Sequence, residues 1–234
     1  MNKIKRYNST DKVMVAVDCI IFGFDNERLK LLLIKRSFEP EIGKWSLMGG
    51  FLKKSENLDQ AAARVLKNLT GLENIYLEQL YSYSKIDRDP VDRTISVAYF
   101  ALISIDKYKI QISKDHDAKW FDINDYPKPI FDHSKMIKKA LVRLRRKALT
   151  YPIGFELLPE KFTMKQLQDL YESIFNKEID KRNFISKVIS LNVLIKTEEK
   201  DKSTSKKGAF LYRFDENKYN ENKKQGYNLS IKLK

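Results

Sequence analysis

Groups that crosslink a chain or hold metals are scarce in this sequence of 234 residues, which contains one cysteine and two histidines. Cys19 has no second cysteine with which to form an intrachain disulfide. So few thiol and imidazole groups also leave little from which to build a zinc site. We therefore expect no disulfide framework, no metal site and no bound cofactor.

Long apolar runs are missing as well. The longest, residues 13–22, is interrupted by Asp18 and falls far short of the roughly 20 residues that a membrane helix needs. The N-terminal residues do not combine a basic start, an apolar run and small cleavage residues, as a secretory signal would. These absences predict a cytoplasmic protein that does not span a membrane.

Acidic residues are outnumbered, because 31 Asp and Glu face 45 Lys and Arg, for a net charge of +14. This excess favours a polyanionic partner such as DNA or RNA. The densest basic run, residues 135–147, fits either a solvated helix face or a surface that meets phosphates. With 42% hydrophobic residues, the chain has enough apolar material for a packed core, which excludes disorder.

A break in the pattern at residues 151–154 predicts two domains. Proline disfavours helix for the residue before it, and glycine often ends a helix. We place the boundary there, so that residues 1–150 form the first domain and residues 151–234 form the second. The basic stretch 134–147 is then a linker helix that closes the first domain.

The first domain mixes strands and helices. Apolar runs predict strands, and residues 57–69 carry apolar side chains at the spacing of an amphipathic helix, with Asn57 and Gln60 placed as a capping box. The predicted strands cover residues 13–22, 29–35, 76–85, 94–105 and 119–122.

The second domain predicts two short helices and a hairpin. Thr163 and Gln166 form another capping box, and Asp180 is placed to cap the next helix. An apolar run at 193–195, a polar stretch and a second apolar run at 209–214 complete a winged helix-turn-helix. The chain as a whole is therefore expected to be α+β.

A spaced set of residues between Gly50 and Leu72 resembles the Nudix box, whose pattern is G-x5-E-x7-R-E-U-x-E-E-x-G-U. The residues in register are Gly50, Glu56, Arg64, Leu66, Gly71 and Leu72. The positions of the three metal-binding glutamates hold Val65, Asn68 and Leu69 instead. One amide and two aliphatic groups cannot replace three anionic magnesium ligands.

The resemblance therefore implies a Nudix-like α/β/α sandwich with a mixed sheet, but no enzyme activity. Glu56 and Arg64 are expected to persist as a structural ion pair, with a polar contact to a ligand as their alternative role.

With the second domain included, the chain resembles the Nudix-related transcriptional regulators of NAD biosynthesis and of sugar catabolism. The similarity covers nearly the whole chain and includes residues 81–100, 120–133, 157–163, 180–184 and 211–214. Among these regulators, those of arabinose utilisation are the nearest match. The resemblance implies a homodimeric regulator, expected to be a repressor, that binds a double-stranded DNA operator with inverted half-sites.

The effector implied by this branch is a small sugar, L-arabinose in the first place. A regulator of NAD metabolism that senses ADP-ribose is the alternative. A divergent Nudix hydrolase and an RNA-binding or scaffold protein are further hypotheses. Magnesium-dependent turnover would distinguish the hydrolase, and a preference for RNA over a palindromic duplex would distinguish the scaffold.

Two sets of residues in the first domain are candidates for the effector site. Aromatic side chains stack on sugar rings, although each of them fits the core as well; they are Trp45, Phe51, Tyr83, Tyr99 and Trp120. Charged side chains donate to and accept from hydroxyls, although a solvated hairpin loop is the alternative; they are Arg36, Asp87, Arg88, Asp89 and Arg93. His133 invites a catalytic role, but we expect Asp132 to cap the helix that follows.

The DNA-binding residues are expected on three segments of the second domain. Helix 180–190 should read bases, with Arg182 and Asn183 as the base-contacting pair. The other candidates on that helix are Lys181, Ser186 and Lys187. The start of the preceding helix should contact phosphates through Thr163, Lys165 and Gln166. The polar stretch read as the wing, or alternatively as a disordered basic loop, contributes Lys202, Lys206 and Lys207.

Overall fold

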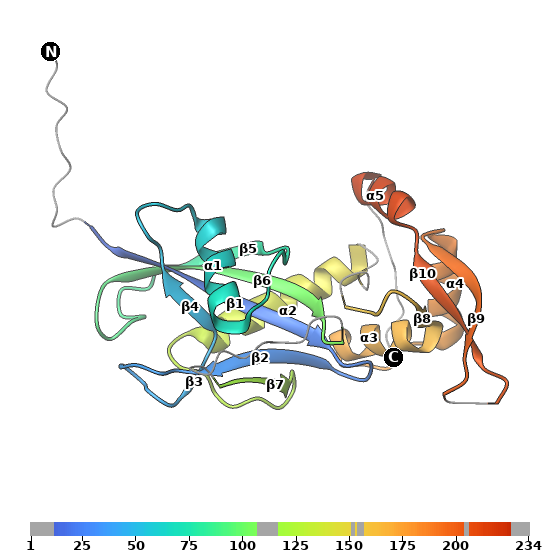
Figure 1. Cartoon of the computed structure of the whole chain (residues 1–234), viewed down its shortest axis with the longest axis horizontal. Helices are drawn as coiled ribbons and strands as arrows, with labels where there is room; N and C mark the ends of the chain where they lie inside the picture. Colours follow the sequence, from blue (N-terminus) through green and yellow to red (C-terminus); the bar gives the residue numbers. More distant parts are fainter. Residues whose placement is uncertain (1–11, 107–116, 151–152, 154–156, 204–205, 226–234) are drawn as a thin grey trace, which may run out of the picture.

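The computed structural model describes residues 12–106, 117–150, 153, 157–203 and 206–225, and forms two units (Figure 1). The strands, in chain order, are β1 (Met14–Phe24), β2 (Leu29–Lys35), β3 (Trp45–Ser46), β4 (Met48–Phe51), β5 (Glu78–Tyr83), β6 (Thr94–Ser104), β7 (Ala118–Asp122), β8 (Phe162–Thr163), β9 (Leu194–Asp201) and β10 (Ala209–Phe214). The helices are α1 (Leu58–Thr70), α2 (His133–Thr150), α3 (Met164–Phe175), α4 (Lys181–Ser190) and α5 (Glu216–Gln225).

The first unit is built around a mixed sheet, as the sequence predicts. Its strand order is β3-β2-β1-β6-β5, with β4 paired to β1 and β7 paired to β2. The central strands β1 and β6 run parallel over their whole length, while the other pairs are antiparallel. The short strands β3 and β4 were not predicted, because two to four residues carry too little periodicity to be recognised.

Helices cover both faces of this sheet (Figure 1). On one face α1 packs Ala62 and Val65 against Val17 of β1. On the other face α2 packs Met136 and its neighbours against the alternate residues of β1, such as Ile20. Burial on both faces explains why β1 reads as an almost continuous apolar run. The expected α/β/α sandwich is therefore present.

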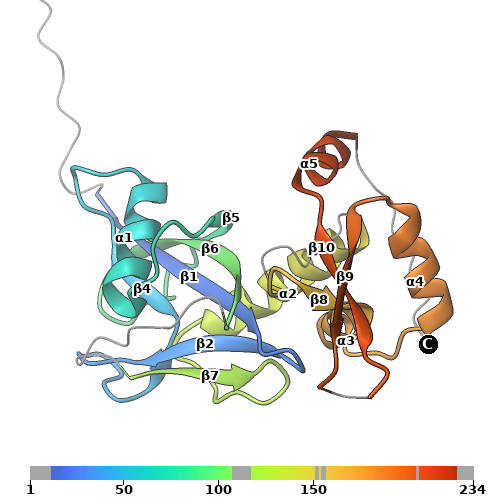
Figure 2. The same ribbon diagram turned by 45° about the vertical axis from the view of Figure 1, so that its right-hand side comes forward.

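The second unit is a winged helix. The strands form a small antiparallel sheet in the order β8-β10-β9, beside which α3 and α4 pack (Figure 2). Both predicted caps are present: Thr163 and Gln166 form a capping box on α3, and Asp180 accepts a hydrogen bond from the Asn183 N–H at the start of α4. Only Ile153 of the predicted break at 151–154 lies within the described residues, and it is buried.

One apolar core runs through both units. Leu31 and Leu33 of the large sheet, Leu144 of α2, and Leu170 and Phe184 of the winged helix belong to the same cluster of buried side chains. A core shared in this way ties the orientation of the winged helix to the sheet and to α2. Within the described residues, no helix has the length and apolar character needed to cross a membrane.

Polar contacts reinforce this junction. The backbone N–H of Leu29 donates to Ser173 Oγ at 2.6 Å, and Arg145 Nε donates to the carbonyl oxygen of Ile174 at 2.8 Å. Gln166 Nε2 also donates to Asn26 Oδ1 at 3.3 Å. The helix α2 thus begins within the first unit and is hydrogen-bonded to the second near its end.

Candidate functional site

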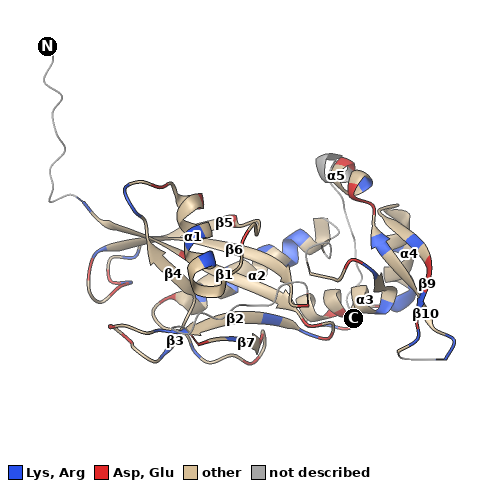
Figure 3. Cartoon of the chain, viewed as in Figure 1, with Lys and Arg blue, Asp and Glu red and all other residues tan. Residues whose placement is uncertain are grey.

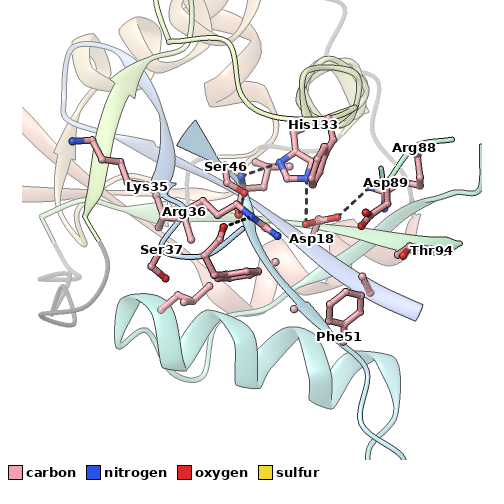
Figure 4. Close-up of a pocket in the computed structure, with 18 residues that line it drawn as sticks. Asp18, Lys35, Arg36, Ser37, Ser46, Phe51, Arg88, Asp89, Thr94 and His133 are labelled. Atoms are coloured by element: carbon pink, nitrogen blue, oxygen red, sulfur yellow. Dashed lines mark hydrogen bonds and ion pairs between the residues drawn. The ribbon is translucent and has the colours of Figure 1, made fainter. Parts of the chain in front are cut away.

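A pocket lies where β1, the end of β2, β4, the loop before β6 and the start of α2 come together (Figure 4). Its polar and charged lining includes Asp18, Arg36, Ser46, Arg88, Asp89 and His133. These residues come from five separate segments of the chain. Among the described residues, Asp18, Arg88 and His133 are the only buried Asp, Glu, Lys, Arg or His side chains, and all three line this pocket.

Asp18 is the centre of this pocket. Its carboxylate projects from β1 on the face that α2 covers, because it has the same strand parity as Ile20, and only 5% of the residue is exposed. Ser96 Oγ donates to Asp18 Oδ2 at 2.5 Å. Gly49 leaves room for the carboxylate, since a Cβ at that position would lie 2.4 Å from Asp18 Oδ1.

Arg88 supplies the positive charge next to Asp18. Its side chain is 3% exposed and donates from Nη2 and Nε to the two carboxylate oxygens of Asp132, at 2.8 and 3.2 Å. The same Nη2 lies 3.7 Å from Asp18 Oδ2. Asp132 therefore uses its carboxylate to hold Arg88, and the expectation that it caps the following helix is replaced by this buried ion pair.

His133 completes the group as a neutral side chain. The backbone N–H of Leu47 donates to His133 Nδ1 at 3.2 Å, so that the proton of the neutral ring lies on Nε2. Nε2 faces Asp18 Oδ1 at 3.6 Å. Burial lowers the pKa of His133, against the opposing effect of Asp18 and Asp132. The imidazole consequently presents an N–H to the pocket.

The outer part of the pocket is more open and more basic. The Arg36 guanidinium stacks on the Phe38 ring at 3.9 Å and lies 5.7 Å from the Phe131 ring. Burial lowers the pKa of Arg36, while the charge of Asp89 acts in the opposite direction. Figure 4 shows the Arg36 side chain on the side of the pocket away from Arg88. The outer end thus offers a cation and aromatic faces.

Four of the predicted ligand-binding residues line the pocket: Arg36, Phe51, Arg88 and Asp89. Asp18, Ser46 and His133 also line the pocket, although the sequence did not indicate them as ligand-binding residues. A lone acid in an otherwise apolar strand was the available signal for Asp18. No local pattern marks Ser46 or His133, because their roles depend on neighbours distant in the sequence.

The predicted aromatic residues other than Phe51 lie elsewhere. Trp45 packs edge-on against Phe121 with ring centroids 4.8 Å apart. Tyr83 packs edge-on against Tyr81 beside the core. Tyr99 lies on the opposite face of the sheet, where its hydroxyl donates to Asp59 at 2.7 Å, and Trp120 also packs there. These side chains serve packing, so their assignment to the ligand site is corrected.

Two predicted charged residues are also outside the pocket. Asp87 is exposed and pairs with Lys85 at 2.8 Å. Arg93 donates to the backbone carbonyl oxygens of Ser84, Lys85 and Thr94 and so stabilises the turn between β5 and β6. The guanidinium of Arg93 is satisfied by backbone, which corrects its expected role as a ligand for the effector.

The positions of the missing metal ligands do not fit a magnesium ion. Val65 is buried, and its Cγ2 lies 2.7 Å from where a Cβ on Gly50 would stand. Glu56, the remaining acid of the motif, is held by Arg64 through two hydrogen bonds of 2.5 and 2.8 Å. This bond lowers the pKa of Glu56 to about 2. The expected structural ion pair is present. Within the described residues, no group of His, Cys, Asp and Glu side chains is arranged to hold a metal ion.

The exposed face of α4 carries Arg182, one of the two residues predicted to read bases. Phe184 and Val188 are buried, as the sequence indicates, and this leaves Lys181, Arg182 and Ser186 exposed. Basic segments mark α4 and the loop between β9 and β10 in Figure 3. Lys187 is partly buried on the same helix. The arrangement offers donors to bases and phosphates.

Other predicted DNA contacts need correction. The Oδ1 atom of Asn183 is buried, so the amide cannot offer its acceptor to a base. Thr163 is 5% exposed, and with Gln166 it is engaged in the helix cap. Lys165 is exposed and pairs with Asp169, and its contact with a phosphate stays a prediction.

The wing is the loop that joins β9 to β10. Lys202, Lys206 and Lys207 are exposed in it, as predicted, while residues 204–205 lie outside the described part. Within the described residues these three lysines form no salt bridge, so they can contact phosphates without breaking one.

Two family models match the chain. Residues 12–141 match the NUDIX domain, and residues 154–214 match the NrtR DNA-binding winged helix domain. The ADPR-responsive transcriptional repressor NtrR of Acinetobacter baylyi is 34% identical over 217 residues, covering 90% of this chain and 86% of that protein. An ADP-ribose pyrophosphatase of Methanocaldococcus jannaschii is 38% identical over 136 residues, covering 58% of this chain and 77% of that protein.

Solved structures give the same picture. Shewanella oneidensis NrtR in complex with a 27mer DNA is 32% identical, with a TM-score of 0.79 over 94% of this chain and 99% of that chain. Its NUDIX domain in complex with ADP ribose is 34% identical, with a TM-score of 0.52 over 59% of this chain and 94% of that chain. The similarity to the full-length protein extends over both units.

Proposed function

The chain belongs to the NrtR family, in which a Nudix domain is joined to a DNA-binding winged helix domain, and we propose that it is a transcriptional repressor whose operator binding is controlled by ADP-ribose. The observation that carries this proposal is the continuous core between the pocket-bearing unit and the winged helix. A ligand in the pocket is thereby mechanically connected to the DNA-reading unit.

ADP-ribose replaces L-arabinose as the first choice of effector. The A. baylyi relative is an ADPR-responsive repressor, and the NUDIX domain of the S. oneidensis protein is known in complex with ADP ribose. The pocket also suits a ligand with both phosphates and sugars, because Arg36 offers it a cation and Asp18 offers it a hydrogen-bond acceptor. Regulation of NAD metabolism, the alternative from the sequence, follows from this choice of effector.

The helix α2 supplies a route for coupling. At the start of α2, Asp132 pairs with Arg88 and His133 faces Asp18. Near the other end, Arg145 donates a hydrogen bond to the carbonyl oxygen of Ile174 in α3. A ligand that binds one orientation of α2 more tightly shifts the population of winged-helix arrangements. In a homodimer this would change the spacing of the two α4 helices on inverted half-sites.

We further propose that ADP-ribose is bound and not hydrolysed. Val65, Asn68 and Leu69 replace the carboxylates that hold magnesium in active members of the Nudix fold, and Glu56 is occupied by Arg64. A hydrolase remains the second candidate, favoured by the similarity to the M. jannaschii pyrophosphatase. Turnover of ADP-ribose with magnesium or manganese at about 1 per second or faster, a rate typical of enzymes, would establish it.

The proposed function is tested by DNA binding with and without effector. Fluorescence anisotropy with a palindromic operator duplex should show a changed affinity when ADP-ribose is added and no change with L-arabinose. A thermal unfolding assay should show stabilisation by ADP-ribose, since a ligand at about 100 times its dissociation constant adds about 2.7 kcal/mol. Light scattering of the free and DNA-bound protein at micromolar concentration should report a dimer.

A further inference from the structure

We propose that Asp18 and His133 form a subsite for an uncharged, hydroxyl-bearing sugar ring at the inner end of the pocket, and that this subsite rejects a phosphate. The inference rests on the proposed function for the identity of the complete ligand. It adds the orientation in which that ligand enters the pocket and the residue that selects it.

The first observation is the incomplete hydrogen bonding of Asp18. Oδ2 accepts a hydrogen bond from Ser96 and faces Arg88, whereas the described residues place no hydrogen-bond donor on Oδ1. His133 Nε2 lies 3.6 Å from Oδ1, which is beyond hydrogen-bond range. An ionised carboxylate oxygen has two lone pairs, so Oδ1 keeps acceptor capacity that faces the pocket.

The second observation is that a donor stands beside this acceptor. Because Leu47 N–H donates to Nδ1, the neutral ring of His133 carries its proton on Nε2. A hydroxyl group both donates and accepts, and can therefore bridge Asp18 Oδ1 and His133 Nε2. An ionised phosphate oxygen only accepts, so it would leave the carboxylate unsatisfied while placing a second negative charge against it.

The third observation is that the nearby cation is already neutralised. Arg88 donates hydrogen bonds from Nε and Nη2 to Asp132. The distance from Nη2 to Asp18 is about one ångström longer than the distance from Nη2 to Asp132. Asp18, Asp132, Arg88 and neutral His133 together leave one net negative charge. Arg36 also lines the pocket and is more exposed than Arg88, so it is the cation better placed for a diphosphate. This places the sugar beside Asp18 and the phosphates in the more exposed part of the pocket.

The experiment compares ligands that differ only at the inner end. The full chain is titrated calorimetrically with ADP-ribose, ADP and ATP. The β-phosphate carries a ribose in ADP-ribose, no further group in ADP and a third phosphate in ATP. We expect ADP-ribose to bind at least about tenfold more tightly than ADP, the effect of one hydrogen bond to a charged group, and ATP to bind most weakly. Binding of ATP as tight as that of ADP-ribose would overturn the subsite.

The Asp18→Asn variant tests the charge directly. It keeps the size of the side chain but removes the repulsion, so the preference for ADP-ribose over ATP should shrink by about tenfold. Asp125→Asn, the same change at an exposed position after β7, should leave the preference unaltered. An unchanged preference in folded Asp18→Asn protein contradicts the proposal, and if this variant does not fold, the wild-type ligand series decides alone.

The experiments distinguish failure of the proposed function from failure of the subsite. If ADP-ribose does not bind the wild-type chain at all, the effector assignment is wrong. Titrations with L-arabinose and with inorganic pyrophosphate then judge the subsite. Binding of the neutral sugar in preference to pyrophosphate supports it, whereas binding of pyrophosphate alone, or of neither compound, overturns it.

Discussion

The pocket and the DNA-reading face are built on opposite principles. Asp18, Arg88 and His133 are buried and come from distant parts of the chain, so each depends on the others for its charge state and position. Arg182 and Lys181 are exposed neighbours on one short helix. Changes in the pocket should therefore disturb folding and ligand binding together, whereas changes on α4 should affect DNA recognition alone. Four predictions test this contrast.

The largest expected effect is on stability, from Arg88→Ala. Removing this guanidinium leaves the buried Asp18 and the partly buried Asp132 without their cation, and breaking a buried ion pair in this way costs about 3–5 kcal/mol. Urea unfolding followed by circular dichroism measures the change. The matched control is Arg182→Ala on α4, for which less than about 0.5 kcal/mol is expected at an exposed site. Similar stabilities for the two variants would remove the contrast between the regions.

The second prediction concerns specificity for DNA. Arg182→Ala should lower the affinity for the operator by about 1–3 kcal/mol, the discrimination carried by one arginine that contacts a base, and leave the affinity for a random duplex nearly unchanged. Anisotropy titrations with both duplexes measure the ratio. If the variant keeps the wild-type ratio, base reading has been assigned to the wrong helix.

The third prediction is a pH dependence of stability that originates in the pocket. Burial holds the pKa of His133 below its ordinary value of about 6.5. Just below pH 6.5 the imidazole therefore stays neutral in the folded protein, while in the unfolded chain it takes up a proton. The contribution of His133 to the free energy of unfolding is therefore greatest above about pH 6.5. It decreases as the pH falls towards the pKa of the folded state, by at most about 1.4 kcal/mol per pH unit.

His133→Asn isolates this contribution, because asparagine still offers an acceptor to the Leu47 N–H but does not titrate. Unfolding curves between about pH 7.5 and pH 5 should converge for the two proteins as the pH falls. A constant difference over this range would mean that the imidazole is not held neutral by the fold.

The smallest effect is expected from the wing. Lys206→Ala should weaken operator and random duplexes alike and reduce the slope of log affinity against log salt by about 0.9, the value for one phosphate contact. Anisotropy titrations at several salt concentrations measure this slope. A selective loss of operator binding would instead place Lys206 among the base-reading residues.

Much of the local structure was predictable from the sequence. The capping boxes at Asn57 and Thr163, the cap at Asp180 and the amphipathic stripe of α1 are all present in the structure. Each depends on residues three or four positions apart, whose geometry follows from the helix itself. The Glu56–Arg64 pair was predictable for a similar reason, since the spacing of the Nudix box carries it.

The ligand site was predictable only in part, because side-chain direction and pairing depend on the assembled sheet. Residues one position apart on a strand face opposite sides, which is why Tyr99 points to α1 while its neighbour Ala98 faces the α2 side.

The order of the two units, their helices and caps, and the absence of the metal-binding carboxylates all follow from local patterns in the amino-acid sequence. Only the tertiary structure brought Asp18, Arg88 and His133 together and turned the Asn183 amide oxygen into the protein. The difference arises because helix periodicity and capping depend on residues that are close together in the chain. The charge, tautomer and accessibility of a buried group are set by whichever distant segments pack against it.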